Sequence, residues 1–157
     1  MELEIKHMER LRQINNYITY RPRVKTPIGV GTILLDQNCY RIEYDNGNYE
    51  NLIKSLSFWK DNFKLCLNTI SDLTQEIEVN GEKFYPLEKL TEIFGGRPIS
   101  FDGNCFYTTI NKSVVRKKED VVPLHFSQLD AFNKLFEWHF DVFGLIEKNL
   151  AININNL

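Results

Sequence analysis

The chain has 157 residues and a net charge of −2, with 19 Lys and Arg against 21 Asp and Glu. Hydrophobic residues make up 43% and charged residues 25%, which excludes wholesale disorder and a globally basic protein that coats nucleic acid. No apolar run approaches the roughly 18 residues that a membrane helix needs. We expect a cytoplasmic protein without membrane contact, built as one domain or two small ones.

The N-terminal residues 2–18 have the spacing of an amphipathic helix, with apolar side chains near one face and charged residues between them. Pro22 and Pro27 follow this stretch. Because the residue before a proline is pushed towards extended geometry, we expect the helix to end before them.

The clearest strand signal is the stretch 28–35, which is rich in β-branched residues. Its two glycines, Gly29 and Gly31, permit sharp bending or close approach of another backbone. Residues 40–44 then alternate apolar and charged side chains, which is typical of a half-buried strand.

A tight hairpin is predicted at Asp45-Asn46-Gly47, with residues 48–52 as the returning strand. Residues 63–67 would supply a closing strand. Three short strands with a Gly-x-Gly entry and an Asn-Gly hairpin predict a small SH3-like or Tudor-like antiparallel barrel.

The middle of the chain carries further turn signals. Ser71 resembles the cap of a short helix, and hairpins are predicted around Asn80-Gly81 and Asp102-Gly103-Asn104. Pro86 begins a predicted helix, because proline is favoured at the first helical position. The side chains expected on its buried face are Leu87, Leu90, Ile93 and Phe94.

The strongest helical pattern begins at Ser127, and aromatic and aliphatic residues recur at helical spacing as far as Leu150. Asn149 is its expected left-handed cap, and residues 151–154 alternate like an edge strand. The sequence therefore predicts an α+β fold with subdomains 1–70 and 71–157, or one compact unit, ending in a long amphipathic helix.

Cys105 lies in the sequence Asp102-Gly103-Asn104-Cys105, which resembles the nucleophile motif of ovarian-tumour-type cysteine deubiquitinases. A thiolate nucleophile needs a base, and His125 is the candidate. However, residues 107–110 have the pattern of a strand, whereas that family places its cysteine at the start of a helix. We therefore interpret the motif as a hairpin turn and keep a cysteine hydrolase as an alternative.

The sequence gives little indication of metal binding or of catalysis by other groups. The three cysteines and three histidines lack metal-ligand spacing, so we expect no metal and no cofactor. Glu137 and Asp141 lie four residues apart on the predicted long helix, and we interpret them as part of its solvated face. Without a nucleophile and base in credible positions, we expect a protein that is not an enzyme.

Two clusters of basic residues are candidates for phosphate contacts, one near the first strands and one after residue 110. Exposed aromatic residues near the first cluster are candidates for stacking on bases, with Tyr40 and Tyr49 as further options. The predicted binding residues are Arg21, Arg23, Lys25, Arg41, Tyr44, Trp59, Arg116, Lys117 and Lys118.

Two segments carry a resemblance to a known group of proteins: residues 136–152, Phe-Glu-Trp-His-Phe-Asp-Val-Phe-Gly-Leu-Ile-Glu-Lys-Asn-Leu-Ala-Ile, and residues 71–82. Together they resemble small phage and prophage proteins of the Bacteroidetes, over about residues 63–157. The abundance of Asn, Ile and Lys beside only two Ala residues indicates an AT-rich genome and agrees with such an origin. The resemblance implies no activity, cofactor or site residue.

We therefore expect an accessory protein of a phage or mobile element that acts by binding. The leading hypothesis is inhibition of a host defence nucleoprotein, in the manner of an anti-CRISPR protein, because aromatic residues make up 13% of the chain and anchor protein interfaces. The alternatives are a binder of nucleic acid or of a nucleotide signal, and a minor virion or assembly component. The long aromatic helix is also compatible with a homo-oligomer.

Overall fold

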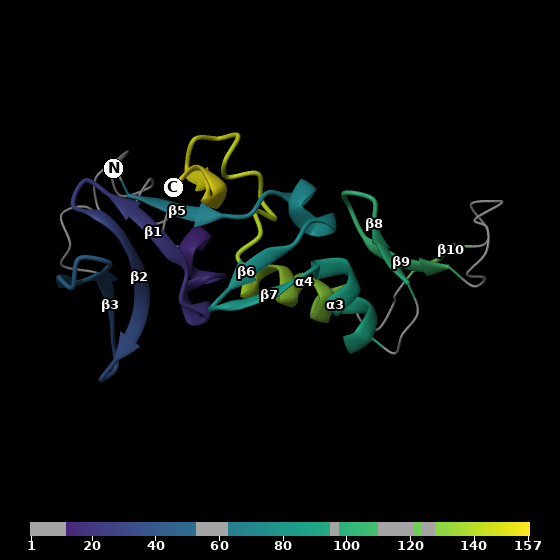
Figure 1. The fold of residues 1–157 in the computed structure, drawn as a ribbon, viewed down its shortest axis with the longest axis horizontal. Helices are drawn as coiled ribbons and strands as arrows, with labels where there is room; N and C mark the ends of the chain where they lie inside the picture. The colour runs from purple at the N-terminus through teal and green to yellow at the C-terminus, as the bar shows by residue number, and fades with distance from the viewer. Residues whose placement is uncertain (1–11, 53–62, 95–97, 110–120, 124–127) are drawn as a thin grey trace. The chain divides into compact units, whose positions relative to one another are not determined.

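The computed structural model describes residues 12–52, 63–94, 98–109, 121–123 and 128–157 (Figure 1). The chain divides into two compact units. The first contains Met1–Asn68 together with Phe136–Leu157, and the second contains Thr69–Leu135. Because the chain leaves the first unit after Asn68 and returns to it at Phe136, the second unit is an insertion in the first.

The first unit is built on a mixed sheet. Among the described residues its strand order is β11-β5-β1-β2-β3-β4. All neighbours are antiparallel except β11 and β5, which are parallel. The strands are β1 (Arg23–Thr26), β2 (Gly29–Asp36), β3 (Cys39–Tyr44), β4 (Tyr49–Asn51), β5 (Lys64–Leu67) and β11 (Ala151–Asn153).

The predicted α+β class is confirmed, but the described strands do not close into the predicted SH3-like or Tudor-like barrel, because β4 and β11 stay at opposite edges of the sheet. The expected closing strand does form as β5. It pairs with β1 on one side (Figure 1) and with the C-terminal strand β11 on the other, so β11 occupies the second edge of β5.

Strands β2, β3 and β4 form two hairpins, of which the predicted one, at Asp45-Asn46-Gly47, is confirmed. β2 and β3 pair from Gly31 opposite Tyr44 to Asp36 opposite Cys39, and the two residues between them have positive φ angles. Such a two-residue turn matches the twist of the strands it joins. The second hairpin turns at Gly47, where φ is +87°, and leads into β4.

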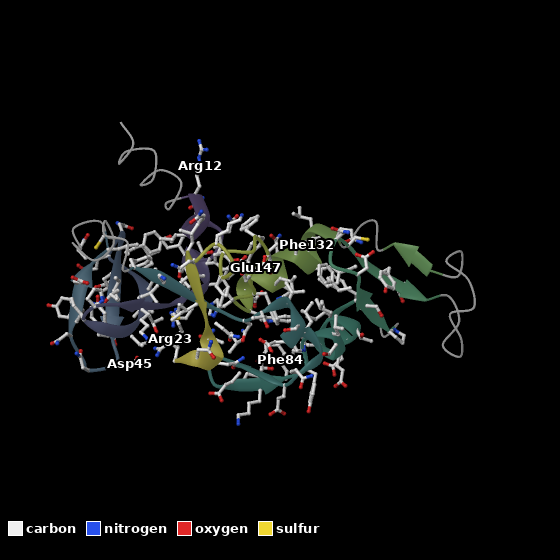
Figure 2. The ribbon with its side chains drawn as sticks, turned by 90° about the horizontal axis from the view of Figure 1, so that it is seen from above. Arg12, Arg23, Asp45, Phe84, Phe132 and Glu147 are labelled. Carbon is white, nitrogen blue, oxygen red and sulfur yellow. The ribbon has the colours of Figure 1, made fainter. Side chains whose placement is uncertain are left out.

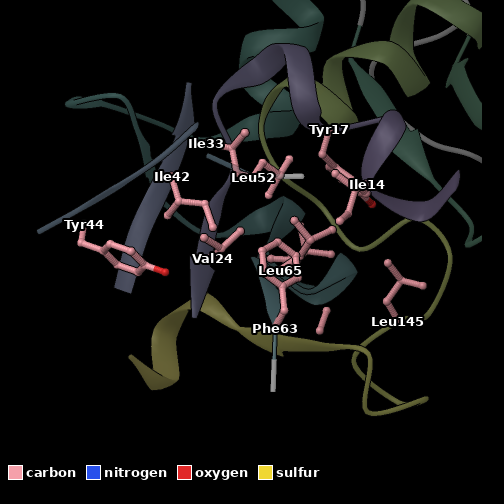
Figure 3. Close-up of a cluster of buried hydrophobic side chains, with 12 residues drawn as sticks. Ile14, Tyr17, Val24, Ile33, Ile42, Tyr44, Leu52, Phe63, Leu65 and Leu145 are labelled. Atoms are coloured by element: carbon pink, nitrogen blue, oxygen red, sulfur yellow. The ribbon is translucent and has the colours of Figure 1, made fainter. Parts of the chain in front are cut away.

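One face of the sheet is the core of the first unit. The alternation of side chains in β1 and β3 directs Val24, Ile42 and Tyr44 inward. Figure 3 shows the cluster, whose members are Ile14, Tyr17, Val24, Ile33, Ile42, Tyr44, Leu52, Phe63, Leu65, Leu67, Leu145 and Ala151. The opposite side, which we call the outer face, carries the alternate residues of the same strands.

Strand β3 lies close to the backbone of β2 at Gly31. A Cβ atom at Gly31 would lie 2.8 Å from the carbonyl oxygen of Glu43, 2.9 Å from Ile42 Cγ2 and 3.1 Å from Tyr44 Cδ1. The first of these neighbours is backbone and cannot rotate away. The close approach proposed for the Gly-x-Gly stretch is therefore confirmed at its second glycine.

Replacing Gly31 by Ala should destabilise the protein by about 1–3 kcal/mol, because the added methyl group forces the two strands apart. Urea unfolding monitored by circular dichroism measures the effect. Leu35→Ala on the same strand is the control, since Leu35 is 63% exposed and its truncation should change stability by less than about 0.5 kcal/mol. Equal stability of the Gly31→Ala variant and the wild type would contradict the close approach.

The N-terminal helix is described only from residue 12. Residues 12–15 are helical, and a turn leads into the 3-10 helix η1 (Ile18–Tyr20). Residues 2–11 of the predicted helix lie outside the described residues. Ile14 and Tyr17 belong to the buried cluster, so the described end of this segment packs on the sheet as an amphipathic element.

The predicted long C-terminal helix is wrong. Helix α4 (Gln128–Glu137) has ten residues, and turns replace the helix from Trp138 onward. The backbone becomes left-handed at His139, where φ is +58°. Beyond this point Phe140 and Leu145 reach the core from turns, whereas Phe143 and Leu150 are exposed. Asn149 has the expected left-handed conformation, with φ of +58°.

The helix ends because the chain makes long-range hydrogen bonds instead. The amide of Asn68 donates to the carbonyl of His139 at 2.7 Å, and the amide of Asp141 donates to the carbonyl of Asn68 at 2.9 Å. The Asn68 side chain donates to the carbonyl of Trp138 at 3.0 Å, and the buried Tyr17 hydroxyl donates to that of Phe140 at 2.7 Å. We call these four bonds the Asn68 junction.

Asp141 fixes the turn that follows the junction. Its carboxylate is buried and accepts hydrogen bonds from the amides of Leu145 at 2.7 Å and Ile146 at 2.9 Å. These amides would otherwise lack partners in a region with little water. The interpretation of Glu137 and Asp141 as one solvated helix face is therefore wrong, because the helix ends between them.

Replacing Asp141 by Ala should lower the free energy of unfolding by about 2–4 kcal/mol, because two buried amides lose their acceptor. Urea unfolding followed by tryptophan fluorescence measures this change. Glu147→Ala removes an exposed carboxylate from the same segment and should change stability by less than about 0.5 kcal/mol. Similar values for the two variants would show that the Asp141 carboxylate does not hold the turn.

The second unit begins with the 3-10 helix η2 (Ile70–Thr74), whose cap is Thr69 in a capping box with Asp72, two residues before the predicted cap at Ser71. The predicted hairpin at Asn80 follows as β6 (Ile77–Val79) and β7 (Glu82–Phe84). The predicted helix at Pro86 is confirmed as α3 (Pro86–Ile93). Leu90 is buried as expected, whereas Ile93 is 44% exposed.

The remaining strands of this unit are β8 (Ile99–Phe101), β9 (Phe106–Thr109) and β10 (Val121–Pro123), in the order β10-β9-β8. The predicted hairpin at Asp102–Asn104 joins the first two. Phe132 of α4 packs against Phe101 and Phe106, with ring centroids 6.0 and 5.3 Å apart. The last element, the 3-10 helix η4 (Ile154–Asn156), belongs to the first unit.

No helix within the described ranges combines the length and the apolar composition needed to cross a membrane.

Candidate functional site

The described residues include five of the nine predicted binding residues: Arg21, Arg23, Lys25, Arg41 and Tyr44. All five belong to the first unit. Trp59 and the second basic cluster, Arg116, Lys117 and Lys118, lie outside the described residues, as does His125.

Arg23 is on the outer face of β1 and is held by a carboxylate. Its guanidinium donates two hydrogen bonds of 2.7 Å to the carboxylate of Asp45, in the turn before β4, and one of 3.1 Å to Thr32 Oγ1 (Figure 2). The hydrogen bond from Arg23 lowers the pKa of Asp45, and the same pairing raises the pKa of Arg23. This fork of two parallel bonds is the strong form of ion pair.

Arg41 occupies the outer face of β3 and has three neighbours there. It donates to Asp36 Oδ2 at 2.8 Å and to Glu43 Oε2 at 3.4 Å. Its guanidinium carbon lies 5.6 Å from the centre of the Tyr49 ring, within the range of a cation–π interaction. Its Nε atom is buried without a hydrogen-bond partner. The charge of Arg41 is thus neutralised, and its guanidinium supports an aromatic ring.

The first basic cluster is therefore not a strip of unneutralised charge. Lys25 and Arg21 are exposed. Lys25 stands opposite Lys64 of β5, whose ammonium donates to Asn149 Oδ1 at 2.6 Å. With Arg23 and Arg41 both neutralised, this face offers few of the free cations that phosphate contacts require.

Tyr44 lies on the other side of the sheet. Its side chain is 3% exposed, and its hydroxyl oxygen is 3.0 Å from Thr26 Oγ1 and donates to the carboxylate of Glu50. Burial, and then the hydrogen bond to Glu50, raise the pKa of Tyr44 to about 12. The ring is therefore part of the core and is not accessible for stacking on a base.

Tyr49 is the aromatic residue that the outer face does present. It is 72% exposed and stands opposite Glu43 in the pairing of β3 and β4. Sequence reasoning named it only as one of several stacking candidates. The alternation of side chains along strands β3 and β4 distinguishes the exposed Tyr49 from the buried Tyr44, because the two side chains point to opposite faces of the sheet.

These residues form one continuous patch across the four neighbouring strands β1 to β4. Arg23, Thr32, Glu43 and Tyr49 stand in one cross-strand row. Leu34, Arg41 and Asn51 stand in a second row two residues further along. We call the two rows, with Asp36 and Asp45 as ion-pair partners, the outer-face patch.

Cys105 lies in the turn between β8 and β9, as the hairpin interpretation predicts. Asp102 Oδ1 accepts hydrogen bonds from the amides of Asn104 at 2.8 Å and Cys105 at 2.9 Å. Desolvation, and then the Asp102 carboxylate, raise the pKa of the Cys105 thiol. A nucleophile needs the opposite shift. Burial likewise raises the pKa of Cys66, to about 12.

The Cys105 thiol should react with iodoacetamide at pH 7.5 more slowly than a free cysteine does, because its raised pKa leaves less thiolate. Asp102→Asn keeps the turn and removes the charge, so alkylation should become about two- to fivefold faster. Peptide mass spectrometry measures both rates, with exposed Cys39 as the internal control. Faster alkylation of the wild-type Cys105 than of free cysteine would indicate an activated nucleophile.

Within the described residues, no group of three or more His, Cys, Asp or Glu side chains is arranged to hold a metal ion. Comparisons of the chain with protein-family models, with curated proteins and with solved structures gave no match.

Proposed function

We propose that the protein acts by binding a protein partner through the outer-face patch, and that it is not an enzyme. The observation that supports this proposal is the exposed ring of Tyr49, which packs against the guanidinium of Arg41 on the outer face of the sheet. Tyrosine and arginine supply much of the energy of protein interfaces because they offer large contact areas. A pre-ordered pair also loses little side-chain entropy on binding.

The charges around the pair favour a protein over a nucleic acid as the partner. Asp36, Glu43 and Asp45 neutralise the two arginines, so a polyphosphate backbone would meet carboxylates as well as cations. A protein surface with mixed charges can pair with both signs. Binding of nucleic acid through this face is correspondingly disfavoured.

The resemblance to phage and prophage proteins directs the search for the partner. A small protein of such an element that acts by binding is most useful to it when the target is a defence complex of the host. We therefore propose a protein component of a host defence nucleoprotein as the target, with inhibition as the result.

Tyr49→Ala should weaken binding of the partner at least tenfold, because it removes the exposed ring and its cation–π contact with Arg41. The partner is first sought by affinity capture from a Bacteroidetes host lysate, with and without nuclease, and the affinity of the purified pair is then measured by calorimetry. Tyr85→Ala is the matched control, since Tyr85 is 44% exposed and belongs to the second unit.

The proposal is supported if a defence protein binds after nuclease treatment, and if Tyr85→Ala retains an affinity that Tyr49→Ala loses. Equal affinity of the Tyr49→Ala and Tyr85→Ala variants for the partner would show that the partner does not bind at the outer-face patch. If nuclease treatment abolishes capture of every partner, and the purified protein binds the nucleic acid directly, the result would favour the nucleic-acid alternative over a protein partner.

A further inference from the structure

His139 is a titratable side chain at the centre of the Asn68 junction. Only 4% of it is exposed, and its backbone has a φ angle of +58°. Its amide donates to the carbonyl of Phe136 at 3.0 Å, and its own carbonyl accepts from Asn68. One residue thus ends helix α4 and begins the contact with the end of β5.

The imidazole ring of His139 also connects the junction to a third segment, the end of η1. Its Nε2 atom lies 2.7 Å from the carbonyl oxygen of Tyr20, at the end of η1. A carbonyl oxygen can only accept, so in the neutral ring Nε2 carries the hydrogen and Nδ1 does not. Acid therefore adds its proton at Nδ1, and the charge that results is buried inside the junction.

The charged groups on the segments around His139 do not compensate for the cost of burying a protonated ring. From α4, the Glu137 carboxylate favours the protonated ring. From the same turn, Asp141 already accepts two amide hydrogen bonds. On the η1 side, Arg21 is a like charge and is exposed, and Lys64 of β5 bonds to Asn149.

The balance of these effects has a definite sign. Desolvation lowers the pKa of His139, against the smaller opposing effects of the bond to Tyr20 and of Glu137. If the segment around His139 leaves the junction, its imidazole is exposed to water and has the ordinary histidine pKa of about 6.5. In this open state His139 binds a proton more tightly than in the closed junction. The closed junction therefore keeps its full stability above about pH 6.5 and loses it as the pH falls towards the lower, folded-state pKa.

We propose that His139 makes the Asn68 junction acid-sensitive, so that below about pH 6 the segment 138–150 opens away from Tyr20 and Asn68 more often while strands β1, β2 and β3 stay paired. The opening begins at the hydrogen bonds of His139, which reach η1, α4 and the end of β5 in the described part of the chain. The ladder from β1 to β3 has its own pairing.

Hydrogen–deuterium exchange of the full chain tests this proposal, with rates at pH 7.5 and 5.5 corrected for the intrinsic effect of pH. One pH unit below the ordinary histidine pKa, opening of the segment should increase up to about tenfold in peptides from residues 138–150. Peptides from residues 23–44 of the same unit should keep their protection. Unchanged protection of 138–150 in the wild type would overturn the proposal.

The matched variant is His139→Asn, because asparagine accepts a left-handed backbone, as Asn38, Asn80 and Asn149 do in this chain, and does not titrate. Its segment 138–150 should exchange equally at the two pH values. The same acid response as in the wild type would assign the effect to another group.

A second measurement needs no variant. The NMR titration of the His139 ring in the wild-type protein should give a pKa below that of a histidine peptide. An ordinary or raised value would overturn the proposal, whether or not the variant folds.

Discussion

The first unit depends on the hydrogen bonds that Asn68 makes to residues seventy or more positions later in the chain. They anchor the segment that carries β11 beside the end of β5, and β11 then extends the sheet by a parallel strand. They also place Phe140 where the Tyr17 hydroxyl reaches its carbonyl. Because the second unit is inserted between Asn68 and Phe136, the two ends of the insertion must meet for the first unit to be complete.

The same constraint accounts for the conformations at the end of helix α4. A continued helix would satisfy the carbonyls of Trp138 and His139 internally, whereas here both accept from Asn68. The left-handed backbone of His139 is the geometric cost of that exchange. The buried carboxylate of Asp141 then supplies acceptors for amides that the interrupted helix leaves free. The junction, the turn at Asp141 and the buried His139 all occur where helix α4 ends, at Glu137.

The candidate binding site follows from the alternation of side chains in the sheet. Val24, Ile42 and Tyr44 turn towards the core, so Arg23, Arg41 and Tyr49 must point the other way. Cross-strand pairing then sets each arginine within reach of carboxylates from another turn or strand. Sequence reasoning found the two arginines as a local excess of positive charge. It missed their neutralisation, because Asp45 is 22 residues from Arg23 and becomes its partner only through the strand register.

Local chemistry by itself determined the hairpins at Gly47, Asn80 and Gly103 and the helix that begins at Pro86, since turn and cap residues act over a few positions. The α+β class also followed from these local signals. Only the tertiary structure decided that the sheet stays open, that β11 joins it and that α4 stops at Glu137. The hydrophobic spacing of residues 138–150 is compatible with a helix and also with turns that bury Phe140 and Leu145. Long-range hydrogen bonds to Asn68, which no local pattern encodes, select the turns.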